Sequence, residues 1–272
     1  ERPVLPVFRI DLETADAILK EDGLDFDALQ EEIEALGEGG PVWVARDLTA
    51  RVRMRLALGP PETVATYNVL GLLDGADATL ADELVVVSCH YDGPGRAPDG
   101  TLYPGANENG SGVAAMLEIA RLWQEQSFQP RRSVLFAAWA GADLRYSGAH
   151  AFQDRPRILG SYDLSAVVHL DRLGGSTGEG LVVRPVSGRP NLFNLLVASA
   201  GRLGVPVARG GLLRHPYQEV LSGRYGTLVI TWGDPEPALA DDTLENINPR
   251  HLSQAAQVVN LMLITAAHEP RY

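Results

Sequence analysis

Histidine, aspartate and glutamate side chains, which serve as acid–base groups and metal ligands, gather around one strand end and one helix start of this sequence. The apolar run 84–89 is typical of a buried parallel strand, and His90 and Asp92 follow it directly. A loop rich in Gly and Pro then leads to Asn107–Gly112 and to an amphipathic helix predicted over 113–126. Ligands of open α/β sheets bind at the carboxyl ends of strands, so the sequence predicts a site here.

Alternating strands and helices must position these residues. The strands are predicted over 66–72, 84–89, 133–139, 165–170, 181–184 and 227–232, with an antiparallel edge over 42–45 and 49–58. The helices are predicted over 113–126, 147–154, 191–203 and 249–267. This alternation predicts an α/β fold in which a mixed, mostly parallel twisted sheet lies between helices.

A strand ending in His-x-Asp, followed by an acidic residue, Asn-Gly-Ser-Gly and a helix, resembles the co-catalytic zinc aminopeptidases of metallopeptidase family M-28. The resemblance runs from Thr66 to the C-terminus through the family's motif positions in order. It implies the three-layer zinc-exopeptidase fold and two zinc ions that share a bridging carboxylate. It also implies a glutamate that acts as general base.

Some family positions are retained in this chain. His90 matches the first metal ligand, and Asp92 can accept the other ring N–H and fix the tautomer. Asp171, just after a buried strand, matches a later ligand. Glu108 stands where the family has its bridging aspartate, and its extra methylene moves the carboxylate oxygens by about 1.5 Å.

Other positions are lost. The family's Glu-Glu pair, which supplies the general base and then a ligand, falls on Ala142 and Asp143. Ala142 cannot transfer a proton, whereas Asp143 could still bind a metal with a shorter reach and is the remaining candidate for a base. The last ligand, a histidine four residues before an Asp-Thr pair, falls on Ala238.

Sorting the ligands by ion gives the expected metal content. One zinc would be held by His90, Glu108 and Asp171, which is a complete set of three. The other would keep only Glu108 and Asp143, and two carboxylates alone make a poor zinc site. We therefore expect no zinc or one zinc.

Each ligand candidate also has a structural interpretation. His90 and Asp92 can hydrogen-bond each other and nearby backbone. Asp171 can pair with Arg172 or Arg145 instead of a metal ion. The charge of a glutamate at position 108 can also serve the helix N-terminus alone.

The remaining histidines are weaker candidates. His169 lies two residues before Asp171, on the same side of a regular strand, and is expected to be a satisfied core residue more than an assisting ligand. His215 is a candidate to line the substrate pocket. Three histidines without a ligand partner at helical spacing are expected to be structural or exposed: His150, His251 and His268.

The N-terminal part has a different character. A strand is predicted over 4–10, a capped helix over 11–20 and an acidic helix over 26–36. The first of these stretches resembles the tail of the protease-associated domain that some family members carry. The expected organisation is an N-terminal segment, 1–40, and an aminopeptidase-like domain, 41–272.

The amino-acid composition excludes several classes of partner and of metal site. The net charge of −12 argues against nucleic acid and anionic membranes as general partners. The single cysteine, Cys89, excludes an internal disulfide and a cysteine-cluster metal site. No apolar run approaches the ~20 residues that cross a bilayer, and no signal-peptide pattern is present, so neither is expected. The family resemblance implies a peptide or protein ligand and a secreted or envelope-associated location.

Two functions follow from these residues. In the first, the chain is an aminopeptidase-like domain that has lost catalysis and serves as a binding or scaffold module, as the resembling transferrin-receptor ectodomain and nicastrin do. The losses at Ala142 and Ala238 favour it. In the second, it is a mononuclear metallopeptidase whose metal ion is held by His90, Glu108 and Asp171. The complete ligand set favours that alternative.

Overall fold

The computed structural model describes residues 10–35, 47–53, 60, 63–97, 99–154, 160, 162–175, 177–185, 190–210, 217, 226–233 and 240–269. The chain divides into two compact units, Glu1–Thr63 and Val64–Tyr272. Residue 40, where the sequence predicts the domain boundary, and the predicted strand residues 4–9 lie outside these ranges.

The first unit contains the two predicted helices, α1 (Leu12–Glu21) and α2 (Phe26–Ala35). The Asp11 side chain accepts the Thr14 N–H at 2.7 Å, which caps α1 as the sequence predicts. The predicted edge strand over 49–58 is wrong for the part that is described, because 49–53 is not a strand. The backbone N–H groups of Thr49 and Ala50 are instead bound by the Asp22 carboxylate, at 2.8 and 2.9 Å.

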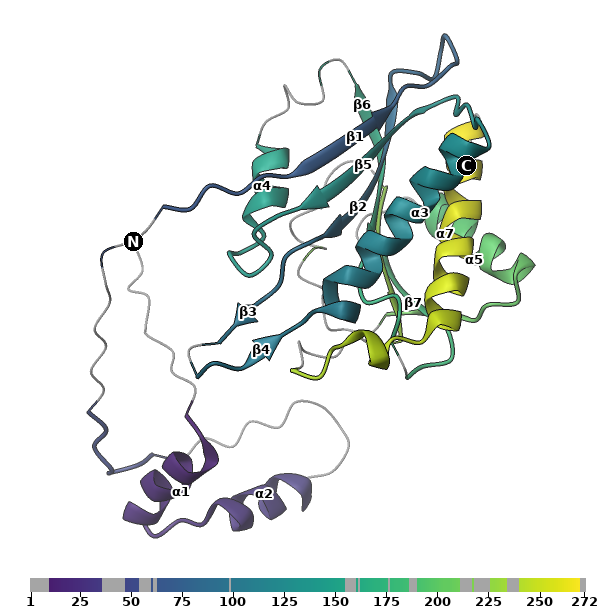
Figure 1. Cartoon of the computed structure of the whole chain (residues 1–272). Helices are drawn as coiled ribbons and strands as arrows, with labels where there is room; N and C mark the ends of the chain where they lie inside the picture. Colours follow the sequence, from purple (N-terminus) through teal and green to yellow (C-terminus); the bar gives the residue numbers. More distant parts are fainter. Residues whose placement is uncertain are drawn as a thin grey trace. The chain divides into compact units, whose positions relative to one another are not determined.

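The second unit is built on a mixed sheet, which confirms the predicted fold class (Figure 1). Its described strands are β1 (Val69–Leu73), β2 (Glu83–His90), β5 (Ser133–Trp139), β6 (Asp163–Leu170), β7 (Leu181–Pro185), β8 (Val207–Arg209) and β9 (Gly226–Trp232). They are ordered β1-β5-β2-β6-β9-β7-β8, and the four central strands β5, β2, β6 and β9 are parallel to one another. β1 and β7 join antiparallel, so β1 provides the antiparallel edge.

Helices cover both faces of this sheet (Figure 1). The helices are α3 (Ser111–Glu125), α4 (Ser147–Gln153), α5 (Pro190–Arg202) and α7 (Pro249–His268), and each overlaps a predicted range. Alternate residues of β2 enter two cores: Val85 and Val87 pack on the side of α3, α5 and α7, whereas Leu84 and Val86 pack on the side of α4. Burial on both faces explains why the central strands are continuous apolar runs.

A short π-helix, η1 (Ala106–Gly110), leads directly into α3. Gly112 at the start of α3 allows the helix to approach the sheet, since a Cβ there would lie 2.7 Å from the Leu170 carbonyl oxygen and 3.2 Å from the Cys89 Cβ. The site residues on β2, η1 and β6 are therefore brought together by backbone contact. Within the described ranges, no helix is both long and apolar enough to cross a bilayer.

Candidate functional site

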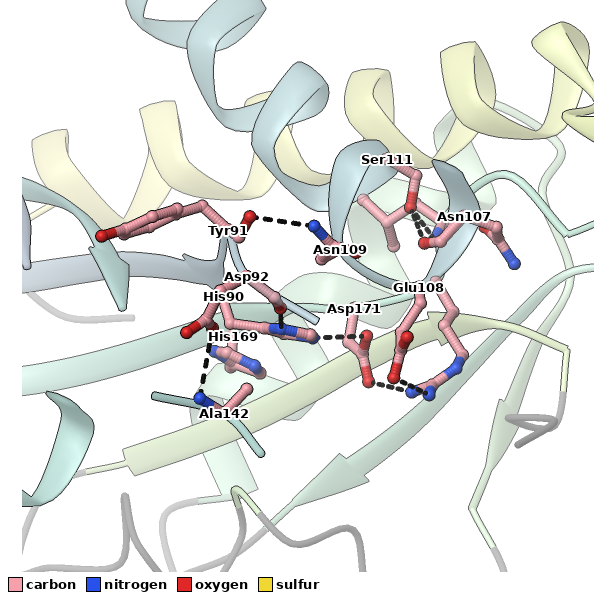
Figure 2. A network of polar contacts seen from close by, with 12 residues as sticks. His90, Tyr91, Asp92, Asn107, Glu108, Asn109, Ser111, Ala142, His169 and Asp171 are labelled. Carbon is pink, nitrogen blue, oxygen red and sulfur yellow. Dashed lines mark hydrogen bonds and ion pairs between the residues drawn. The ribbon is translucent and has the colours of Figure 1, made fainter. Parts of the chain in front are cut away.

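His90 is the last residue of β2, and its side chain is buried at the carboxyl end of that strand (Figure 2). Its Nδ1 lies 2.8 Å from the backbone carbonyl oxygen of Asp92, and its Nε2 lies 3.4 Å from Asp171 Oδ1. Burial lowers the pKa of His90, but the hydrogen bond and negative charge of Asp171 outweigh it, so the pKa is raised overall. The structure therefore brings His90 and Asp171 together.

The expectation for Asp92 changes. The backbone carbonyl of Asp92, and not its carboxylate, contacts the His90 ring. The carboxylate accepts the N–H groups of Gly141 and Ala142, the latter at 3.1 Å, and so holds the loop that follows β5 (Figure 2). A carboxylate with two backbone donors is an effective loop anchor, since charged acceptors form strong hydrogen bonds.

Ala142 and Asp143 follow that anchored point. The Ala142 methyl group is partly buried, and the Asp143 side chain is exposed. Burial and the Asp92 charge raise the pKa of Asp143 above its ordinary value, while His90 and Arg172 oppose the shift. Asp143 therefore lies within the electrostatic reach of the site.

Glu108 is carried by η1, whose backbone is fixed from the C-terminal part of the chain. The Asp242 carboxylate accepts the N–H groups of Asn107 at 2.7 Å and Glu108 at 2.9 Å. The Asn107 side-chain oxygen accepts the Gly174 N–H at 2.8 Å, which ties η1 to the loop after β6. The sequence does not predict this role of Asp242, which stands there only as part of the family's Asp-Thr pair.

Arg172 joins the two carboxylates of the site. Its Nη1 donates to Asp171 Oδ2 at 2.8 Å, and its Nη2 donates to Glu108 Oε1 at 3.0 Å. The Asp171 and Glu108 side chains lie next to each other in Figure 2, which marks both contacts. Burial raises the pKa of Glu108 above its ordinary value, and the Arg172 charge opposes that shift without cancelling it. Of the two pairings that the sequence left open for Asp171, the structure shows the one with Arg172.

An aromatic stack lies on the α4 side of the site. The His169 ring lies 3.9 Å from the Tyr217 ring and 6.4 Å from the His90 ring, between centroids. His169 is fully buried, and its Nδ1 lies 3.0 Å from Ser88 Oγ, which agrees with the prediction of a satisfied core histidine. Tyr217 was missed; its only signal was an aromatic residue two positions after His215.

Two candidates, His215 and Ala238, lie outside the described residues. The other histidines take structural positions, as expected: His251 Nδ1 lies 2.7 Å from the Gly175 carbonyl oxygen, and its ring stacks on Trp232 at 4.3 Å. His150 is exposed on α4, and His268 lies beside Phe128 at the end of α7.

The described residues do not fit a two-zinc centre. In those ranges, no group of three or more His, Cys, Asp or Glu side chains has an arrangement that could hold a metal ion. A guanidinium, which carries positive charge and donates only, is bound to both carboxylates. Two features remain typical of a cation site: the 3.4 Å approach of His90 to Asp171, and the buried Glu108 Oε2, which has no hydrogen-bond partner in the described part of the chain.

The comparisons with known proteins agree with this fold. The family model "Peptidase family M28" matches residues 68–213. Aminopeptidase YwaD of Bacillus subtilis (strain 168) is 25% identical over 238 residues, which are 82% of this chain and 50% of that protein. A probable zinc metalloprotease of Pyricularia oryzae is 36% identical over 120 residues, which are 43% of this chain and 22% of that protein.

A solved structure shows the same architecture. BSAP, a zinc aminopeptidase from Bacillus subtilis, superposes with a TM-score of 0.60 and 25% identity, covering 75% of this chain and 51% of that chain. The chain therefore spans about half or less of the length of these relatives. The family model matches more than half of the 272 residues, and its match confirms the resemblance seen in the sequence: this chain belongs to peptidase family M28.

Proposed function

We propose that this chain is a zinc-aminopeptidase-like domain that has lost peptidase activity and acts as a binding or scaffold module for a peptide or protein ligand. The observation that carries the proposal is the Ala142 methyl group, held beside the site at the position where the family resemblance puts the general base. The neighbouring carboxylate, Asp92, is occupied by two backbone N–H groups. Loss of a general base alone costs a hydrolase about 10²–10⁴ in rate.

Asp143 is a poor replacement for that base. Its side chain is exposed, and no hydrogen bond of its carboxylate is found within the described residues. A general base needs to lie within hydrogen-bond reach of the proton that it abstracts, directly or through one water. The shorter aspartate, one position further along the loop, does not supply the lost geometry.

A single-ion hydrolase is the rival function, and one observation favours it. His90 Nε2 and Asp171 Oδ1 converge to 3.4 Å, and Glu108 Oε2 is buried without a hydrogen-bond partner in the described part of the chain. Against it stands the pairing of both carboxylates with Arg172. The proposed function predicts no turnover, whereas the rival predicts zinc-dependent turnover that requires Asp171.

Turnover is therefore the test. Incubated with excess Zn²⁺ and leucine p-nitroanilide, the protein is expected to release p-nitroaniline no faster than the substrate alone. The reason is that Ala142 supplies no general base and Arg172 is bound to both carboxylates of the candidate metal site. The matched control is Asp171→Asn, which keeps the side-chain volume and removes the charge. Zinc-dependent turnover that Asp171→Asn abolishes would contradict the proposal and establish the single-ion hydrolase.

The other expectations from the resemblance also remain predictions. They are the protease-associated character of residues 1–40, the domain over 41–272, and a secreted or envelope-associated location. Cell fractionation with an antibody against the chain would test the last of these.

A further inference from the structure

Two acidic side chains share the centre of the site. The Asp171 side chain is 1% exposed and the Glu108 side chain 13% exposed, and both belong to elements that are fixed by backbone hydrogen bonds. The Asp171 N–H donates to the Ile230 carbonyl oxygen at 3.1 Å, which fixes the backbone of Asp171 at the end of the sheet. Buried carboxylates this close to each other require a cation or a shared proton.

Arg172 supplies that cation from within the chain. Each terminal guanidinium nitrogen binds a different carboxylate, at 2.8 and 3.0 Å, so the group bridges them instead of pairing with one. The Arg172 side chain is only 16% exposed. Because arginine does not lose its proton at any physiological pH, its single positive charge offsets part of the negative charge of the two carboxylates without an ion from solution.

The backbone of Arg172 supports this assignment. Its φ of +48° lies in the left-handed region, which favours glycine or asparagine and is uncommon for other residues. Its carbonyl oxygen accepts the Trp232 N–H at 3.0 Å, which fixes that conformation. The left-handed backbone disfavours arginine at this position, so the two side-chain contacts of Arg172 explain why an arginine stands here.

We propose that Arg172 is a built-in replacement for the metal ion, and that its guanidinium closes the His90/Glu108/Asp171 cluster to divalent cations. The inference goes beyond the loss of the base, since an enzyme without a base could still hold zinc. The proposal rests on the proposed function in one respect only, which is that the cluster holds no catalytic metal ion. A divalent ion that approached the same carboxylates would meet the fixed positive charge of Arg172 at close range, and like charges repel strongly in a buried site.

The test is a calorimetric titration of Zn²⁺ into chelator-stripped protein, with the wild type compared with Arg172→Met. Methionine keeps an unbranched, largely apolar stem but carries no charge. We expect Arg172→Met to bind one Zn²⁺ per chain with an affinity at least about 100-fold above the wild type, because the repulsion is removed and both carboxylates are released. Equal affinities of folded wild type and folded variant would overturn the proposal.

A second pair of variants covers the case in which Arg172→Met does not fold. Glu108→Gln removes one carboxylate, and Glu108→Gln/Arg172→Met removes the guanidinium as well. In the double variant, only one carboxylate, that of Asp171, is left without the guanidinium. His90 and Asp171 remain as possible zinc ligands in both variants. The double variant is expected to bind Zn²⁺ at least about 10-fold more tightly than Glu108→Gln, and equal binding would overturn the proposal.

Failure of the Arg172 proposal can be distinguished from failure of the proposed function. Wild-type protein that binds Zn²⁺ tightly but does not hydrolyse leucine p-nitroanilide would overturn the role of Arg172 and leave the loss of activity in place. Wild-type protein that hydrolyses the substrate would contradict the proposed function directly. Binding by calorimetry and turnover by absorbance are read on the same sample.

Discussion

Replacing Arg172 with methionine is expected to lower the free energy of unfolding by about 3–5 kcal/mol at neutral pH, the range found when one partner of a buried charge network is removed. The reason is that Asp171 and Glu108, 1% and 13% exposed, keep their negative charges but lose the only cation bound to both in the described residues. Urea-induced unfolding followed by circular dichroism would measure the change.

The chain offers a matched control on the surface of α3. Arg121 also bridges two carboxylates, Glu118 at 2.7 Å and Glu125, but these side chains are 49% and 55% exposed. Arg121→Met is expected to cost less than about 1 kcal/mol, since solvent screens exposed pairs. Similar losses for Arg172→Met and Arg121→Met would contradict the account of a buried cation.

The penalty of Arg172→Met also has an expected pH dependence. Burial already raises the pKa of Glu108 in the folded protein, and removing the guanidinium raises it further above the unfolded value. The folded variant then binds protons more readily than the unfolded chain, so its stability increases as the pH falls toward that raised pKa. The difference between variant and wild type should therefore be smaller near about pH 5 than near about pH 7.5.

The second large effect is expected at Arg132, where β5 begins next to the end of α7. The Arg132 side chain is 3% exposed and donates to the carbonyl oxygens of Ala266, at 2.9 Å, and Glu269. Its Nε also binds Glu83 at 2.6 Å, although that carboxylate is 36% exposed and contributes less. Carbonyl groups at a helix C-terminus have no intrahelical partner, so this arginine satisfies the carbonyl oxygen of the buried residue Ala266, which would otherwise be left unpaired.

Arg132→Met is accordingly expected to lower the free energy of unfolding by about 2–4 kcal/mol, measured by urea denaturation. The adjacent Arg131 is the control: it pairs with Asp77 at 2.7 Å, but its side chain is 33% exposed. Arg131→Met should cost about 1 kcal/mol or less. A larger loss at position 131 than at 132 would show that the end of α7 is not held as described.

The central part of the fold is predictable from the sequence because both faces of its strands are buried. The run Ser133–Trp139 forms a strand with the predicted bounds, and β2 differs from its prediction by one residue at each end. The short edge strand β8 was not predicted, since Val207–Arg209 is mostly exposed and has no alternating pattern. The π-helical geometry of Ala106–Gly110 was also missed, because it depends on Asp242, more than 100 residues away.

The site was predictable to a similar degree. The structure brings His90, Glu108 and Asp171 together, since they follow strands or precede a helix at one end of a parallel sheet. Their role as metal ligands stays a prediction. The sequence offered Arg172 only as one of two partners for Asp171. Its bridge to Glu108 depends on a left-handed backbone at position 172, which no sequence pattern indicated. The prediction that the Asp92 carboxylate accepts the His90 ring N–H was wrong for a similar reason. The carboxylate accepts the N–H groups of Gly141 and Ala142 instead, because the loop after β5 folds back onto it.

The measurement that tests the central claim most directly is the zinc content of the wild-type protein, by mass spectrometry, after chelator treatment, incubation with excess Zn²⁺ and desalting. If the Arg172 guanidinium holds the place of the cation between Asp171 and Glu108, no zinc is retained. One or two zinc ions per chain, held through desalting, would contradict the account.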